Sequence, residues 1–179
     1  MKKIIIISNI FIAHLAFSQI AIGKSAISTL ADNVTPNPNI SLEFGTGNKG
    51  IILPWVTSAA GVTSAVPGTI IFDTTDYKIK VKLAASWKDL SIDTNGIADT
   101  TLQNSLTDQS TAKTVIGTNA ATDTTPGILV LSDTNRAMVL PKMASPHLNI
   151  KNPAPGMIAY DTSTKQLAVF NGTVWSFWK

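Results

Sequence analysis

The apolar residues of this 179-residue chain come in short runs that end at turn-forming residues. In the run 77–83, three lysines alternate with Ile79, Val81 and Leu83. Successive side chains of a strand point to opposite faces, so this run predicts a strand with a basic, solvated outer face. Pro-Gly and Asp-Thr pairs between the runs favour turns. The pattern therefore predicts short strands joined by tight turns.

The runs occur twice in the same order, which identifies an internal repeat. The segment 48–54 resembles 135–141, and 67–74 resembles 155–162. The offset between the copies is 87 residues before the Pro-Gly pair and 88 from it onward. We predict a structural role for the shared positions, which are Pro54 and Pro141, Gly68 and Gly156, Asp73 and Asp161, and Trp87 and Trp175.

The repeat predicts an all-β fold of two short β-meander modules, copy one (residues 41–90) and copy two (residues 128–179), joined by an extended polar linker over 91–127. An extended lead-in over 19–40 precedes copy one. In each copy, one strand is expected to run from Gly50 to Val56 or from Ala137 to Met143. The Asn171-Gly172 pair predicts a hairpin turn near the C-terminus.

A single copy has too few apolar side chains to be stable alone. Three arrangements would solve this problem: the copies pack together, the chains oligomerise, or the copies lie along a fibre.

Residues 1–18 have the layout of a secretory signal peptide. Lys2 and Lys3 precede an apolar run, and Ala16 and Ser18 place small residues before a cleavage site at Gln19. The run is too short to span a bilayer, and no later segment approaches the required ~20 apolar residues. The sequence therefore predicts a protein that is secreted or displayed on the cell surface, without a membrane span.

Composition narrows the chemistry. The chain has no Cys, which excludes a disulfide framework and a thiol nucleophile. Only 14% of residues are charged, and Glu43 is the single Glu, which disfavours exposed helices. Without Lys2 and Lys3 the net charge falls from +3 to about +1, and no clustered basic face predicts nucleic-acid binding.

Candidate catalytic and binding residues are few, and no cofactor or metal site is expected. His147 has no second His in the mature chain, and no nucleophile elbow accompanies it. The stretch 45–50 lacks the spacing of a phosphate loop, and Asp93-Thr94-Asn95-Gly96 lacks the rest of a calcium loop. Most Asp residues lie in turn-like contexts, which leaves an Asp-dependent hydrolase as a weak alternative. Trp55 and Trp178 have no matching Trp in the other copy and are the candidates for ligand or partner contact.

Both copies resemble a module found in secreted proteins of Bacteroidota-type bacteria. The resemblance rests on Leu-Pro at 53–54, on Pro-Gly-Met-Ile-Ala-Tyr-Asp-Thr at 155–162 and on Val-Phe-Asn-Gly-Thr-Val-Trp at 169–175. Copy two is also similar to hairpin segments of phage tail fibres. The chain departs from the pattern after Leu-Pro, where Trp55 or Lys142 replaces the usual Arg. The resemblance implies a fibre-like or adhesive surface role and no catalytic residue.

The sequence thus predicts a secreted, non-enzymatic structural or adhesive protein that self-associates, with a trimer suggested by the resemblance. The alternative is a carbohydrate-binding module that binds a surface glycan or another cell-surface partner through Trp55 or Trp178.

Overall fold

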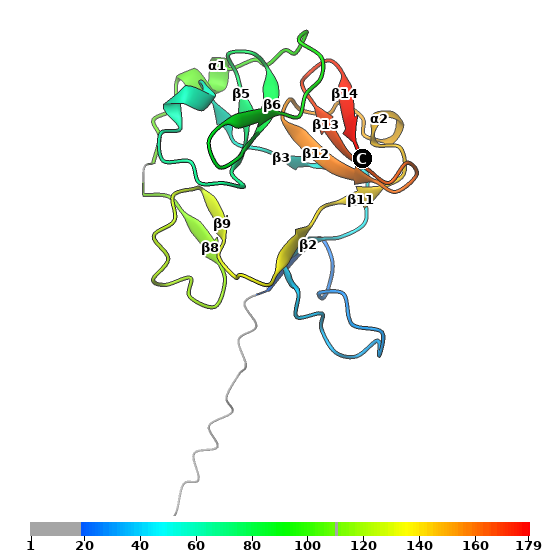
Figure 1. Cartoon of the computed structure of the whole chain (residues 1–179). Helices are drawn as coiled ribbons and strands as arrows, with labels where there is room; N and C mark the ends of the chain where they lie inside the picture. Colours follow the sequence, from blue (N-terminus) through cyan, green and yellow to red (C-terminus); the bar gives the residue numbers. More distant parts are fainter. Residues whose placement is uncertain (1–18, 110) are drawn as a thin grey trace, which may run out of the picture.

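The computed structural model describes residues 19–109 and 111–179, so the signal peptide predicted over 1–18 lies outside the described residues. The prediction of an all-β fold is confirmed (Figure 1). The strands are β1 (Ile20–Ile22), β2 (Ile40–Phe44), β3 (Ile51–Ile52), β4 (Trp55–Val56), β5 (Ile70–Asp73), β6 (Lys78–Lys82), β7 (Trp87–Asp89), β8 (Thr114–Ile116), β9 (Leu129–Leu131), β10 (Ala137–Val139), β11 (Lys142–Met143), β12 (Met157–Asp161), β13 (Gln166–Phe170) and β14 (Trp175–Trp178). The helical segments are the 3-10 turn η1 (Ala59–Gly61), α1 (Thr101–Asn104) and α2 (Pro146–Asn149).

Each copy forms a sheet of the same topology. The strand order is β4-β5-β6-β7 in copy one and β11-β12-β13-β14 in copy two. In both sheets the first two strands are parallel and the remaining pairs are antiparallel hairpins. The Phe72 N–H donates to the Pro54 carbonyl, and its counterpart Tyr160 donates to Pro141, both at 2.9 Å. Equivalent residues of the sequence repeat therefore make equivalent backbone hydrogen bonds in the two sheets.

The turns repeat as well. Gly68 and Gly156 have φ of +90° and +79°, a backbone conformation that side chains with a Cβ rarely adopt. Tyr77 and its counterpart Lys165, which close the Asp-Thr turns, also share a positive φ, at +56° and +61°. The Pro-Gly and Asp-Thr pairs thus form equivalent turns in the two copies.

The first strand predicted in each copy is not continuous. It is divided at the Leu-Pro pair, into β3 and β4 in copy one and into β10 and β11 in copy two. Pro54 and Pro141 have no N–H to donate to a neighbouring strand, so the ladder stops at each of them. The division lets the two halves of each run pair with different strands.

The two copies exchange strands, which places distant segments side by side (Figure 1). The β3 strand of copy one pairs antiparallel with β12 of copy two, and Ile51 lies opposite Ile158. The β10 strand of copy two pairs in parallel with β2, where Met138 lies opposite Leu42. Of the three arrangements left open by the sequence, packing of the copies on each other is present within one chain.

The segments before each copy also correspond. The β1 strand pairs in parallel with β2, and β8 pairs in parallel with β9. Just beyond these pairs, the Gly45 N–H donates to Ile22 at 2.8 Å and the Ser132 N–H donates to Ile116 at 3.0 Å. Residues 91–127 contain α1 and β8, so this stretch supplies the strand that pairs with β9 of copy two.

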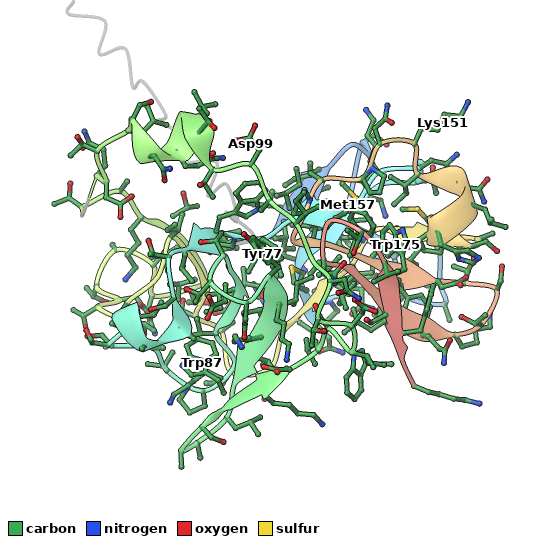
Figure 2. The ribbon with its side chains drawn as sticks, turned by 90° about the horizontal axis from the view of Figure 1, so that it is seen from above. Tyr77, Trp87, Asp99, Lys151, Met157 and Trp175 are labelled. Carbon is green, nitrogen blue, oxygen red and sulfur yellow. The ribbon has the colours of Figure 1, made fainter. Side chains whose placement is uncertain are left out.

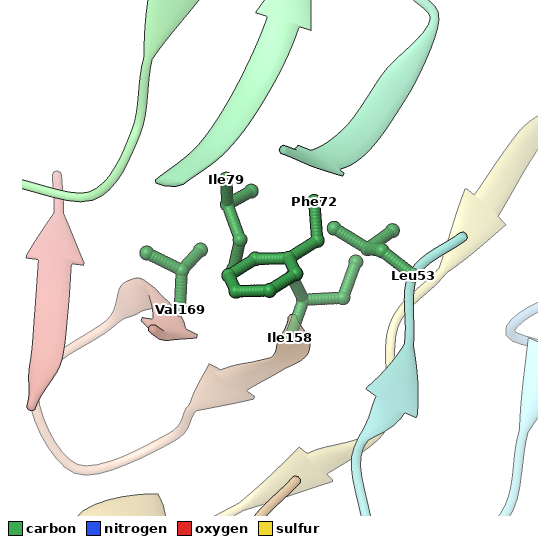
Figure 3. Close-up of a cluster of buried hydrophobic side chains, with 5 residues drawn as sticks. All are labelled: Leu53, Phe72, Ile79, Ile158 and Val169. Atoms are coloured by element: carbon green, nitrogen blue, oxygen red, sulfur yellow. The ribbon is translucent and has the colours of Figure 1, made fainter. Parts of the chain in front are cut away.

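The central core lies between the two sheets. Figure 3 shows Phe72 and Ile79 of copy one pointing toward Ile158 and Val169 of copy two, with Leu53 beside them. Phe72, Ile79 and Val169 are fully buried. Burial of such side chains against each other is the main favourable term in folding, so the copies stabilise each other.

A second cluster lies on the other face of the copy-two sheet. Its buried members come from β11, β12, β13 and the segment that follows α2, and are Met143, Ile150, Met157, Ala159 and Phe170. Trp175 of β14 packs against this cluster. The α2 segment therefore helps to cover copy two on the side away from copy one.

We predict that Phe72→Ala lowers the free energy of unfolding by about 3–5 kcal/mol, because it opens a cavity at the junction of both sheets. Urea denaturation followed by tryptophan fluorescence measures this change. Val34→Ala is the control, since Val34 is 79% exposed, and we expect it to change stability by less than about 0.5 kcal/mol. Equal effects of the two substitutions would contradict the assignment of Phe72 to a shared core.

Candidate functional site

Trp55, a candidate contact residue, lies at the junction between the copies. Its indole N–H donates to the Pro155 carbonyl of copy two at 2.9 Å. Its ring lies 5.7 Å from the ring of Phe72. A Cβ added to Gly156 would lie 3.2 Å from the Trp55 indole nitrogen and 2.9 Å from the Phe72 Cβ. Trp55 therefore connects copy one to the Pro-Gly turn of copy two, a turn that has room only for glycine at residue 156.

Trp178, the other candidate contact residue, also bonds to the opposite copy. Its indole N–H donates to the Leu90 carbonyl at the end of copy one. The Lys88 ammonium lies 5.0 Å from the centre of its ring, within the range of a cation–π contact. The indole donors of Trp55 and Trp178 are thus both used inside the chain, and the carbohydrate-binding alternative gains no support from them.

Trp87 and Trp175 occupy equivalent places on the last strand of each sheet. Figure 2 shows them far apart, one on each sheet. Trp175 is half-buried, with its ring 5.2 Å from the ring of Phe170. Trp87 is also half-buried, and the Lys82 ammonium lies 5.7 Å from the centre of its ring. The two repeat tryptophans hold the outer strands of their own sheets.

Asp73 and Asp161 organise the loop that follows the first strand of each copy. Asp73 accepts hydrogen bonds from the N–H groups of Ala59 and Thr75, at 2.8 and 2.9 Å. Asp161 accepts from the N–H groups of Ser145 and Ser163, at 3.0 and 2.8 Å. Each carboxylate therefore links a distant loop to its own Asp-Thr turn.

The Asp161 carboxyl is fully buried. Burial acts to raise its pKa, but the backbone N–H groups of Ser163 and Ser145 and the Thr164 hydroxyl hydrogen-bond the ionised form and hold the pKa below its usual value. These donors satisfy the charge within the turn. We infer a structural role for Asp161, since its oxygens are directed at backbone donors.

The prediction of a solvated basic face on residues 78–82 is wrong for Lys80, which is 8% exposed. Its ammonium pairs with Asp89 at 2.9 Å and also with Asp76. Burial acts to lower the pKa of Lys80, but the two carboxylates outweigh burial and raise the pKa above its usual value. Cross-strand pairing with β7 and the adjacent turn, which the alternating pattern does not reveal, accounts for the difference.

The Asn171-Gly172 turn is held by the segment that follows copy one. Ile97 donates its N–H to the Asn171 carbonyl at 3.1 Å, and a Cβ added to Gly172 would lie 1.9 Å from the Ile97 carbonyl oxygen. The Asn171 side-chain amide donates to the Asp93 carbonyl at 3.4 Å. Residues 93–97 therefore lie against the copy-two hairpin, and the predicted turn is a contact between segments as well as a reversal of the chain.

His147, the one histidine after residue 18, lies in α2, with its ring 5.5 Å from the Phe177 ring. Within residues 19–109 and 111–179, no three His, Asp or Glu side chains gather in a way that could hold a metal ion. The same residues include no helix that is both long and apolar enough to cross a membrane.

Residues 115–178 match the family model described as a phage tail like trimerisation region. No curated protein and no solved structure matches the chain. The matched segment begins within β8 and includes the complete copy-two sheet, so the similarity of copy two to tail-fibre segments is confirmed. This match supports self-association of the chain in a fibre-like structure.

The strand exchange between the copies is not evident from the sequence pattern. Leu53 is buried at the junction, and its N–H donates to the Gly156 carbonyl of copy two at 3.0 Å. The repeat places Leu53 in copy one and Gly156 in copy two, but the correspondence of the copies does not predict a hydrogen bond between these two residues. The available signal was the Leu-Pro pair, because a proline that stops one ladder allows the strand before it to join another.

We predict that Asp161→Asn lowers stability at pH 7 and flattens its dependence on acid. Because the pKa of Asp161 is lower in the folded chain than in the unfolded chain, its ionised form contributes stability above about pH 4. That contribution is lost as the pH falls through the lower, folded-state value. Urea midpoints between about pH 5 and about pH 2 measure the effect.

Ser163→Ala is the matched control for Asp161→Asn. It removes an exposed side chain but keeps the backbone N–H that bonds to Asp161. We expect its acid dependence to follow that of the unmodified chain. An Asp161→Asn variant with an unchanged acid dependence would contradict the role of the buried carboxylate.

Proposed function

We propose that this chain is an exported structural protein that forms a trimer in a fibre-like surface assembly, and that copy two carries contacts between the three chains. The observation that carries the proposal is the match of residues 115–178 to a phage tail like trimerisation region. We also propose an adhesive role for this assembly, which the resemblance of both copies to modules of secreted bacterial proteins supports. Export follows from the signal-peptide pattern of residues 1–18.

The surface of the matched segment supports the trimer. Leu129, the first residue of β9, is 49% exposed, and Ile128 just before it is 64% exposed. Among the described residues β9 pairs with β8 alone, so one edge of β9 is open. Exposed apolar side chains beside an open strand edge favour association with another chain. The chain also has no Cys, so a covalent staple does not replace such contacts.

We expect the full chain, expressed with its leader in a bacterial host and purified, to have about three times the mass of one chain in size-exclusion chromatography with light scattering. The mass should stay constant over a tenfold dilution, because trimerisation regions of fibres bury extensive apolar surface. A monomer at all concentrations would contradict the proposed function.

We expect the exported chain to begin at Gln19, which intact-mass spectrometry of the extracellular or surface fraction measures. A variant with Ala16→Arg and Ser18→Arg provides the control, because large charged residues block cleavage at a site that needs small ones. Recovery of an uncleaved chain in the cytoplasm of the host would contradict export.

A further inference from the structure

The contact between the two copies in one chain is head-to-tail, because each copy uses a different surface. Copy one contributes β2 and β3, whereas copy two contributes β10 and β12. The side chains follow the same rule, with Phe72 and Ile79 of copy one packed against Ile158 and Val169 of copy two. In a head-to-tail contact each partner uses only one of its two interacting surfaces, so each copy keeps one surface, its unused half, that no partner covers.

The unused half of copy two includes one edge of β10. The Ala137 N–H donates to the Asn39 carbonyl at 2.8 Å, so Ala137 and Val139 direct their backbone groups toward β2. Alternation along a strand directs the backbone groups of Met138 and Leu140 to the opposite edge. In the described part of the chain, β10 pairs with β2 alone, and no strand lies on that opposite edge.

The counterparts of these residues in copy one show what such an edge binds. Ile51 and Leu53 correspond to Met138 and Leu140, and they use the same edge to bind β12. The Leu53 N–H donates to the Gly156 carbonyl at 3.0 Å. The corresponding partner of Leu140 is the carbonyl of Gly68, a residue that is exposed whereas Gly156 is buried.

The unused half of copy one includes the matching edge of β5. The Lys82 N–H donates to the Thr69 carbonyl at 2.8 Å, so Thr69 faces β6 and Ile70 faces the other side. The counterpart of Ile70 is Ile158, which pairs with Ile51. Among the described residues, β4 reaches only Phe72 and Asp73 on that side of β5, so the edge at Ile70 has no strand beside it.

The apolar side chains show the same asymmetry. Phe72 and Ile79 are completely buried, but their counterparts Tyr160 and Leu167 are partly exposed. Leu42 is 1% exposed where β10 covers it, but its counterpart Leu129 is 49% exposed.

The same holds for the residues on the other side of the junction. Ile158 and Val169 are buried, but their counterparts Ile70 and Val81 are partly exposed. Each of these five side chains, which the contact buries in one copy, is thus more exposed at its counterpart in the other copy. The exposed set on copy two is complementary to the exposed set on copy one, because both repeat an interface that the chain already makes.

We propose that copy two of one chain docks on copy one of a second copy of this chain, with the same geometry that joins the two copies within a chain. Three chains then close a ring of six modules, related by steps of about 60°, in which no module has an unused half. The number of chains rests on the trimer of the proposed function. The pairing of the edges rests on the repeat itself.

The register of this contact follows from the repeat. By correspondence with Ile52 and Met157, Val139 of one chain lies opposite Thr69 of the next. By correspondence with Met138 and Leu42, Ile51 of one chain lies opposite Leu129 of its neighbour. Neither pair is joined by a strand pairing within the described part of one chain.

A disulfide tests the register, and the absence of native Cys makes the experiment clean. In the full chain, Thr69→Cys with Val139→Cys should oxidise to a covalent species of three chains on a non-reducing denaturing gel, and reductant should return single chains. The two positions form a non-hydrogen-bonded antiparallel pair, with Cα atoms about 4.5 Å apart, within the range of a disulfide.

The matched control uses the pair that the chain already makes. Ile52→Cys with Met157→Cys should form its disulfide within one chain and run as a single chain, because β3 and β12 pair in the same molecule. Thr69→Cys alone and Val139→Cys alone should also run as single chains, because a head-to-tail contact does not place identical positions opposite each other.

A surface variant provides a second test that does not depend on disulfide geometry. Leu129→Lys should convert the trimer to a monomer with unchanged circular dichroism, because Leu129 is half exposed in one chain and covered in the proposed ring. Leu148→Lys is the matched control, since Leu148 is 72% exposed on α2, away from the proposed contact, and it should stay trimeric.

The outcomes separate this proposal from the proposed function. A trimer by light scattering in which the Thr69→Cys, Val139→Cys variant forms no disulfide between chains, or a Leu129→Lys variant that stays trimeric, would overturn the head-to-tail contact and leave the trimer intact. Crosslinked species longer than three chains would overturn the closed ring. A monomeric unmodified chain would overturn both proposals.

Discussion

The burial of Phe72 and Ile79 against Ile158 and Val169 is the interaction on which the rest of this structure depends. Each sheet has short strands and too few apolar residues to form its own core on that face. Joining the sheets face to face removes these side chains from water. With no disulfide in the chain, the shared core must supply what a covalent staple supplies in many small exported modules.

The strand exchange is a consequence of the same constraint. Pro54 ends the pairing of β4 and leaves β3 free to cross to β12, where Leu53 enters the shared core. Trp55 follows directly and closes the junction through the Pro155 carbonyl. The two copies contribute different surfaces to this core, so each copy keeps one interacting surface that the core does not cover. The repeat therefore favours association of several chains.

Much of the local structure was predictable from the sequence, because turns depend on the residues within them. The Pro-Gly pairs form turns with a positive φ at Gly68 and Gly156, and Asn171-Gly172 reverses the chain between β13 and β14. The alternating lysines identified the β6 strand. Their solvation was not predictable, because Asp89 reaches Lys80 from a neighbouring strand that the pattern of residues 77–83 does not contain.

The sequence by itself determined that this chain is all-β, that it contains one module twice, and which residues form the turns of each copy, since these features follow from local backbone preferences and from direct comparison of the two copies. Only the tertiary structure decided that Ile51 leaves copy one for copy two, that Lys80 is buried in an ion pair, and that Leu42 is covered whereas Leu129 is open. The physical reason is that equivalent residues have the same local preferences but different neighbours. In a head-to-tail contact, the position of a module in the assembly determines which of its edges and side chains are covered.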